Sequence, residues 1–195
     1  VGDLVPKDIS RLMLQLKIHA LGLGHSGISE ETLDRLIYFS DHDLIPAVPE
    51  KGSVGASGDL APLAHMSLPL IGYGLFWNEE GTDTIPAEKV LEEHDLESID
   101  LQPKDGLSLI NGTQLMGGYG AYVLEKSLSM MKAADLIAAM SLEALQGSIK
   151  PFDERIHNIR PHEGQQEVAR NVRELLVESE ILESHRNCGK VQDPY

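Results

Sequence analysis

One loop of the sequence combines residue types that could build a reactive group from the backbone itself. It runs Gly52-Ser-Val-Gly-Ala-Ser-Gly-Asp-Leu-Ala-Pro-Leu-Ala64 and contains the tripeptide Ala56-Ser57-Gly58. If this loop is held tightly bent, the backbone nitrogen of Gly58 can bond to the carbonyl carbon of Ala56, and loss of water closes a five-membered imidazolone ring. Loss of the Ser57 hydroxyl as a second water leaves an exocyclic methylene. The product would be a strong electrophile that needs no imported cofactor.

The residues of the tripeptide and its neighbour suit this chemistry. Gly58 has no side chain to crowd the attacking nitrogen, and Ala56 is small for the same steric reason. A helix that begins at Asp59 would direct free N–H groups and its positive dipole end towards the ring, which favours negative charge developing there. Taken alone, however, an Ala-Ser-Gly tripeptide is far more often a plain turn.

Three common functions of a glycine-rich loop fail here on residue type or spacing. A phosphate-binding loop needs Gly-Lys-Ser/Thr at its end, and no lysine follows these glycines. A hydrolase nucleophile elbow needs Gly-x-Ser-x-Gly, whereas Gly58 comes one place too early after Ser57. A dinucleotide-binding fingerprint needs a preceding strand and a βαβ unit, and neither is evident. The loop is therefore left with ring formation or a plain turn.

The whole loop resembles the signature of the histidine ammonia-lyase family, within the wider aromatic amino acid lyases and aminomutases. Two further segments agree with the family and follow in the expected order, Leu109-Ile-Asn-Gly-Thr-Gln114 and Val191-Gln-Asp-Pro-Tyr195. The run from Arg11 through Gly27 resembles the segment that precedes the loop. The resemblance covers nearly all of the chain, and together these motifs are highly specific.

The resemblance implies a cofactor and a reaction. In this family Ala56, Ser57 and Gly58 would become a 4-methylidene-imidazol-5-one group, with no external cofactor. The substrate amino group attacks the methylene carbon, a base removes a β-proton, and ammonia leaves behind an α,β-unsaturated acid. The Gly-Ser-Val-Gly form of the loop and the Asp-Pro-Tyr ending favour L-histidine as the substrate, which gives urocanate.

The resemblance also implies roles for four further residues. Asn111 matches an asparagine near the polar end of the substrate and the ring; its plainer interpretation is a helix N-cap. Leu60 would line the pocket, although a core leucine is the stronger interpretation. Gln192 and Tyr195 would bind substrate and join the hydrogen-bond network of the site, with Tyr195 supporting the catalysis rather than serving as the main base. The main base, a tyrosine, and the arginine for the substrate carboxylate are expected outside the sequence.

Other functions are also compatible with the sequence. A tyrosine or phenylalanine ammonia-lyase is the closest alternative, because the residues that grip the substrate ring are not in this chain. A catalytically silent helical scaffold of the same fold is the alternative from another class.

The resemblance implies a homotetramer with active sites shared between subunits. The start at Val1 without methionine and the stop at Tyr195 predict a fragment that is inactive alone.

The elements that must position these residues are predicted to be helical. Apolar residues recur at helical spacing in residues 7–21 and 111–149, the last helix is amphipathic, and no segment shows convincing strand alternation, so the predicted fold is all-α. It is a long-helix bundle that resembles the fumarase/aspartase architecture. Ser29 is the predicted N-cap of the second helix and Asp59 of the third. The helices are expected at residues 7–21, 29–39, 59–70, 111–149 and 162–183.

We expect residues 1–195 to form part of one ammonia-lyase domain, with N- and C-terminal parts missing. Residues 1–75 would carry helices and the loop of the prosthetic group. Residues 76–105 would form a polar connecting segment, with a short helix at residues 87–94 after Pro86. Residues 106–195 would hold the long central helix and a following segment of the site. Gly117, Gly118 and Gly120 would permit close packing of this long helix.

Composition narrows the partners and the compartment. Sixteen Lys and Arg residues against 31 Asp and Glu give a formal charge of −15, which argues against binding nucleic acid or anionic membranes. Cys188 is the single cysteine and cannot form an internal disulfide, which fits a reducing compartment. No metal is predicted, because the proposed chemistry needs none and no metal-ligand spacing with Cys188 is formed by His25, His65, His157, His162 or His185. No apolar run of about 18 residues appears, and we predict a cytoplasmic protein.

Overall fold

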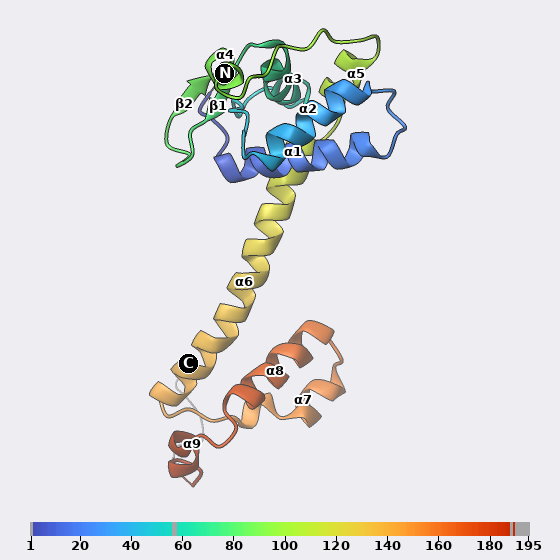
Figure 1. Cartoon of the computed structure of the whole chain (residues 1–195). Coiled ribbons are helices and arrows are strands. Elements are labelled where there is room, and N and C mark those ends of the chain that lie inside the picture. Colours follow the sequence, from blue (N-terminus) through green and yellow to red (C-terminus); the bar gives the residue numbers. More distant parts are fainter. Residues whose placement is uncertain (1, 56–57, 188, 190–195) are drawn as a thin grey trace. The chain divides into compact units, whose positions relative to one another are not determined.

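The computed structural model describes residues 2–55, 58–187 and 189. This part of the chain is mostly helical, with one short β-hairpin, so the prediction of an all-α fold is confirmed (Figure 1). Contacts divide the chain into two units, Val1–Val123 and Leu124–Tyr195. The division falls inside α6, which runs from Gln114 to Ala144, and each unit is described by itself.

The first unit is built from helices and one hairpin that precede the Asn111 motif. They are α1 (Lys7–Gly22), α2 (Glu30–Asp41), α3 (Leu60–Ser67), the 3-10 helix η1 (Leu68–Ile71), β1 (Leu75–Trp77), β2 (Thr84–Pro86), α4 (Ala87–Glu93) and α5 (Asp105–Ile110). The predicted helices at residues 7–21 and 29–39 are confirmed to within two residues at their ends. The predicted helix at 59–70 is α3 followed by η1.

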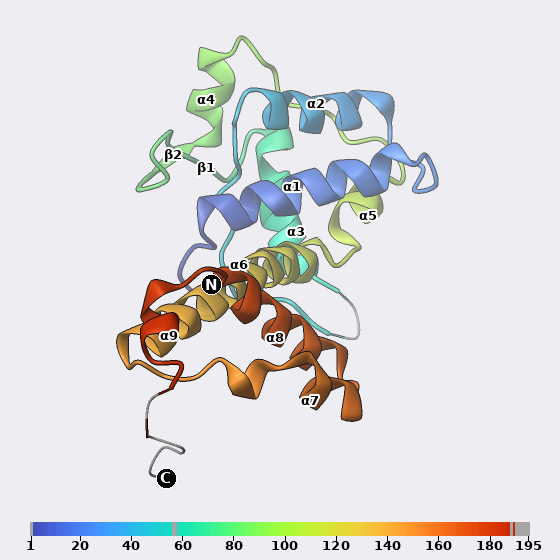
Figure 2. The same cartoon turned by 90° about the horizontal axis from the view of Figure 1, so that it is seen from below.

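Helices α1 and α2 lie side by side and bury their apolar faces (Figure 2). Ser29 precedes α2 as its N-cap, and its Oγ accepts from the backbone N of Thr32 at 3.4 Å, as predicted. Each fully buried large apolar side chain contributes about 1.5–3 kcal/mol to the core. The core of this unit includes Val5, Ile9, Met13, Leu14, Leu21, Leu36, Phe39, Leu63, Met66, Leu70, Phe76 and Leu109.

A buried carboxylate joins α2 to α5. Asp105 accepts hydrogen bonds from the backbone N and Oγ of Ser29 at 2.7 and 2.8 Å, from Thr32 Oγ1 at 3.0 Å and from the backbone N of Gln102 at 2.9 Å. Burial raises the pKa of the Asp105 carboxyl, but the hydrogen bonds from Ser29, Gln102 and Thr32 outweigh burial and leave this pKa below its ordinary value. The start of α2 is thereby fixed to the segment that leads to Asn111.

The segment predicted as a polar connection contains regular structure. Strands β1 and β2 pair in antiparallel fashion, with Phe76 opposite Ile85, and α4 follows Pro86 where a short helix was predicted. The hairpin and α4 lie at the opposite end of this unit from α5 (Figure 1). Each strand has three residues, which is too short for alternation of apolar and polar residues to be visible in the sequence.

The second unit follows the first part of α6. It contains the 3-10 helix η2 (Lys150–Phe152), α7 (Glu154–Ile159), α8 (Glu163–Leu175) and α9 (Glu180–Ser184), and α7 lies beside α8 (Figure 2). Helix α6 is shorter than the predicted 111–149, and the predicted helix at 162–183 is divided into α8 and α9. The division lies near Glu178, whose φ of 60° is incompatible with a continuing α-helix.

No helix among the described residues has both the length and the apolar character that crossing a membrane requires.

Candidate functional site

Backbone pairing closes the glycine-rich loop on both sides of the predicted tripeptide. The N–H of Gly58 donates to the carbonyl oxygen of Val54 at 2.7 Å, and the N–H of Val54 donates to the oxygen of Gly58 at 2.9 Å. Val54 and Gly58 thus form an isolated antiparallel bridge. Ala56 and Ser57, which carry the predicted ring chemistry, lie outside the described residues.

Gly58 occupies a position that admits no side chain. Its φ is +91°, in the region that favours glycine, and the residue is buried. A Cβ atom placed on it would lie 2.4 Å from the carbonyl oxygen of Gly112. Gly58 therefore lets the loop approach the Asn111-Gly112 backbone, a second reason for glycine beyond the freedom of its nitrogen.

Asp59 connects the loop to the start of α6. The residue occupies the N-cap position of α3, but its side chain makes no cap hydrogen bond there, which corrects the prediction that Asp59 caps that helix. Its Oδ2 accepts instead from the backbone N–H groups of Leu115 at 2.8 Å and Met116 at 3.0 Å, in the first turn of α6. Its Oδ1 accepts from Ser53 Oγ at 2.6 Å. The free N–H groups of α6 attract the carboxylate more directly than those of its own helix.

The Asn111 motif forms the turn between α5 and α6. Asn111 is the C-terminal cap residue of α5 in extended conformation, and α6 begins at Gln114, so the N-cap interpretation of Asn111 was wrong. The side chain of Asn111 is exposed. The next carbonyl, that of Gly112, accepts from the backbone N–H of Asp59 at 2.8 Å. This bond places the loop directly against the turn that carries Asn111.

A buried lysine, for which no role was predicted from the sequence, completes this arrangement. Lys17 lies on the buried face of α1, is 2% exposed, and donates from Nζ to the carbonyl oxygen of Asn111 at 3.0 Å. Burial lowers the pKa of its ammonium group to about 8. A signal was present in the sequence, because a lysine that shares a helix face with Met13, Leu14 and Leu21 interrupts an apolar stripe.

Helix α1, which carries Lys17, packs closely on α6. A Cβ on Gly118 would lie 3.3 Å from the carbonyl oxygen of Ile9, and one on Gly117 would lie 3.1 Å from Leu16 Cδ1. The prediction of close helix packing is confirmed at Gly118 and Gly117 but was wrong for Gly120, where an added Cβ would meet nothing within 4 Å. The backbones of α1 and α6 therefore lie close together beside the Asn111-Gly112 turn.

The described site residues fall into one neighbourhood. Gly58 and Asn111 are brought together through the contact of Gly58 and Asp59 with Gly112. Leu60 is the first residue of α3, two positions after Gly58, and is partly buried. Gln192 and Tyr195 lie outside the described residues, so their roles stay predictions.

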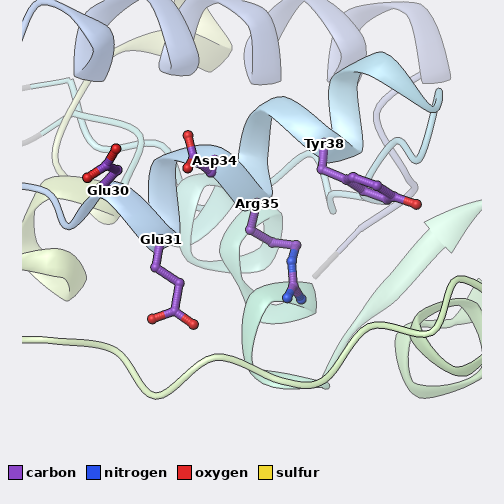
Figure 3. A pocket seen from close by; sticks show the side chains of 5 residues that line it. All are labelled: Glu30, Glu31, Asp34, Arg35 and Tyr38. Atoms are coloured by element: carbon purple, nitrogen blue, oxygen red, sulfur yellow. The ribbon is translucent and has the colours of Figure 1, made fainter.

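A separate hollow lies on the surface of α2. Its lining side chains, Glu30, Glu31, Asp34, Arg35 and Tyr38, project from that helix (Figure 3). The guanidinium of Arg35 donates to the carbonyl oxygen of Glu97 at 2.7 Å, which accounts for its orientation. None of the predicted site residues belongs to this hollow. Among residues 2–55, 58–187 and 189, no group of three or more His, Cys, Asp or Glu side chains is placed to hold a metal ion.

The sequence of the whole chain, which includes this loop and the Asn111-Gly112 turn, matches one protein family. The model of the aromatic amino acid lyase family matches residues 1–195, and the chain belongs to that family. A histidine ammonia-lyase from Homo sapiens is 47% identical over 199 residues, which span 100% of this chain and 30% of that protein. The fumarase-like helical architecture predicted from the sequence is confirmed by these relationships.

Solved structures of other proteins resemble the chain, two of them as follows. The crystal structure of histidine ammonia-lyase from Trypanosoma cruzi has a TM-score of 0.83 and 38% identity, covering 89% of this chain and 34% of that one. That of a tyrosine aminomutase from Streptomyces globisporus has a TM-score of 0.86 and 35% identity, covering 100% and 38%. The chain thus spans about a third of the length of the relatives it matches.

Proposed function

We propose that the chain acts within a longer polypeptide as the electrophile-bearing segment of an ammonia-lyase that converts L-histidine to urocanate and ammonia. The observation that carries the proposal is the 2.8 Å hydrogen bond from the backbone N–H of Asp59 to Gly112 O, which holds the loop beside Asn111. The identity to histidine ammonia-lyases favours histidine over other amino acids.

The loop suits a 4-methylidene-imidazol-5-one derived from Ala56, Ser57 and Gly58. The pairing of Val54 with Gly58 brings the two flanks of the tripeptide together, and any Cβ on Gly58 would collide with the carbonyl oxygen of Gly112. Ring closure consumes the N–H of Gly58, so its bond to Val54 O must be given up. Once formed, the group would supply an electrophilic carbon to the substrate amine.

The surrounding residues would bind and orient the substrate. The exposed side chain of Asn111 offers an uncharged donor and acceptor to the polar end of the amino acid. Leu60 would present an apolar surface beside the loop. Gln192 would bind substrate, and Tyr195 would support catalysis through the hydrogen-bond network.

A tyrosine or phenylalanine ammonia-lyase is the second candidate activity. The 35% identity to a protein named as a tyrosine aminomutase favours it, since that name specifies another aromatic amino acid. A silent scaffold of the same fold would keep the helices without the modified loop.

We further propose that the protein is a cytoplasmic homotetramer with shared active sites, and that residues 1–195 lie in one domain of the subunit. The exposed surface of α6 supports assembly. Its large apolar side chains that are at least half exposed include Val123, Leu124, Leu128, Met130, Met131, Ile137 and Met140. Apolar surface of this extent on one helix is typical of interfaces.

The test is a mass measurement combined with an assay on the complete polypeptide that contains this chain. A digest should yield a peptide spanning Gly52 to Leu63 that is lighter by two water molecules than its encoded mass. Ser57→Ala is the control, because alanine has no hydroxyl to lose. The intact protein should then produce ultraviolet absorbance of urocanate from histidine. Cinnamate or coumarate instead would replace histidine with phenylalanine or tyrosine, and an unmodified peptide without turnover would refute the lyase.

A further inference from the structure

The two consecutive carbonyl groups of the Asn111-Gly112 turn accept hydrogen bonds from residues outside the turn. The oxygen of Gly112 accepts from the backbone N–H of Asp59 at 2.8 Å, which belongs to the loop. The oxygen of Asn111 accepts from Lys17 Nζ at 3.0 Å, which belongs to α1. The N–H of Asn111 also donates to Leu107 O at 3.1 Å. Because each peptide unit is planar, this bond and the one from Lys17 hold the two planes that flank the Cα from which the Asn111 side chain projects.

The charge of Lys17 is costly at this place. Its side chain is 2% exposed, and among the described residues no carboxylate lies within ion-pair distance to compensate its ammonium group. Burial lowers the pKa of Lys17 to about 8 for that reason. A methionine would fill the same core position without this penalty. The hydrogen bond to Asn111 is therefore the interaction that a lysine provides and an apolar residue does not.

We propose that Lys17 is a positioning residue, which holds the Asn111 backbone so that the Asn111 side chain meets the substrate. This inference rests on the proposed function, in which Asn111 binds the polar end of the amino acid. Lys17 acts through Asn111 and does not touch the substrate. A misplacement of Asn111 should weaken substrate binding more than it impairs the formation of the prosthetic group, which depends on the loop.

The same helix offers a matched control. Lys7 of α1 is also buried and donates from Nζ to Asp43 Oδ2 at 2.7 Å and to the carbonyl oxygens of Asn78 and Glu79 at 3.2 and 3.1 Å. Its partners belong to the far end of the helix from Asn111. Lys7→Met therefore removes a buried lysine from α1 without releasing the Asn111 turn.

The experiment compares Lys17→Met with Lys7→Met in the complete polypeptide. We expect both variants to show the loss of two waters in the loop peptide. The KM of Lys17→Met should rise about tenfold, as the loss of one well-placed hydrogen bond implies, with kcat changed less. Lys7→Met should stay within about twofold of the unchanged protein, since its contacts end elsewhere.

A double-mutant cycle separates positioning from general loss of structure. In an Asn111→Ala background, which lacks the side chain to be positioned, Lys17→Met should raise KM no further. Equal KM values for Lys17→Met and Lys7→Met in an active, matured protein would overturn the inference and leave the proposed function intact. An unmodified loop without turnover in the unchanged protein would overturn the proposed function itself. If Lys17→Met does not fold, Lys17→Gln, whose side chain is one atom shorter, replaces it.

Discussion

Asp59 Oδ2 lies 2.8 Å from the backbone nitrogen of Leu115, a residue 56 positions further along the chain. The same oxygen accepts from Met116, so one buried carboxylate caps the first turn of α6 while its own backbone begins α3. The loop that precedes Asp59 and the Asn111 turn that precedes α6 are thereby tied together. The carboxylate of Asp59 therefore supports the candidate site together with the backbone bond from Asp59 N to Gly112 O and the bond from Lys17 to Asn111 O.

Asp59→Asn should weaken this connection. The neutral amide keeps one acceptor oxygen but loses the negative charge that is favourable at the N-terminus of α6. Its NH2 group replaces the other oxygen and cannot accept a hydrogen bond from the donor there. We expect a loss of roughly 2–4 kcal/mol of stability, since hydrogen bonds to a buried charge are involved. Amide hydrogen exchange at Leu115 and Met116 should accelerate. Asp100→Asn, at an exposed position, serves as the control, and equal exchange in both variants would refute the role.

Gly58→Ala should damage the loop, because the added Cβ would lie 2.4 Å from Gly112 O at a φ of +91°. Strain of this kind costs about 1–3 kcal/mol. We expect a lower thermal midpoint and no loss of two waters from the loop peptide. Gly55→Ala is the matched control in the same loop, since its Cβ would meet nothing within 4 Å. A normally matured Gly58→Ala protein would contradict this prediction.

The pKa of Lys17 predicts a dependence of stability on pH. With this pKa lowered from 10.5 to about 8 by burial, the folded protein releases the proton between these values while the unfolded chain retains it. The unfolded state then binds more protons, so the Lys17 contribution raises the free energy of unfolding as pH rises through this range. The thermal midpoint of the unchanged protein minus that of Lys17→Met should therefore be larger at pH 9.5 than at pH 7. A constant difference between the two proteins would contradict the assignment.

The apolar surface of α6 should mediate assembly. Leu128 and Met131 are 52% and 63% exposed and lie three residues apart on one side of the helix. Replacing both with glutamate should dissociate the proposed tetramer, since each buried apolar side chain contributes about 1.5–3 kcal/mol. Light scattering during size-exclusion chromatography measures the mass. Leu23→Glu, at a 60% exposed position at the end of α1, should leave the mass unchanged.

Local patterns predicted much of the fold. The apolar face around Met13 predicted α1, the serine before two glutamates predicted the N-cap of α2, and Pro86 predicted the start of α4. Each of these features depends on residues within a few positions of one another. The family motifs then predicted which loop and which turn belong to the site.

Other features depend on partners that the sequence does not place side by side. The carboxylate of Asp59 binds α6 rather than its own helix because residues 56 positions away arrive beside it. The role of Lys17 depends on the carbonyl of Asn111, 94 positions away. The break before α9 occurs at Glu178, which adopts a positive φ without the glycine that usually marks such a position. Three-residue strands show no periodicity at all.

The separation between Asp59 and its partner also sets an order of events during synthesis. A ribosome that adds about 5–20 residues per second needs about 3–11 seconds to reach Leu115 after Asp59 has been made. During that interval the nascent loop has neither the carbonyl of Gly112 nor the first turn of α6 to support it. A reactive group whose formation requires this support would therefore arise only after the segments that shelter it have been translated. If the proposed group forms, the emerging chain would be spared a strong electrophile while its nucleophilic side chains are still unfolded.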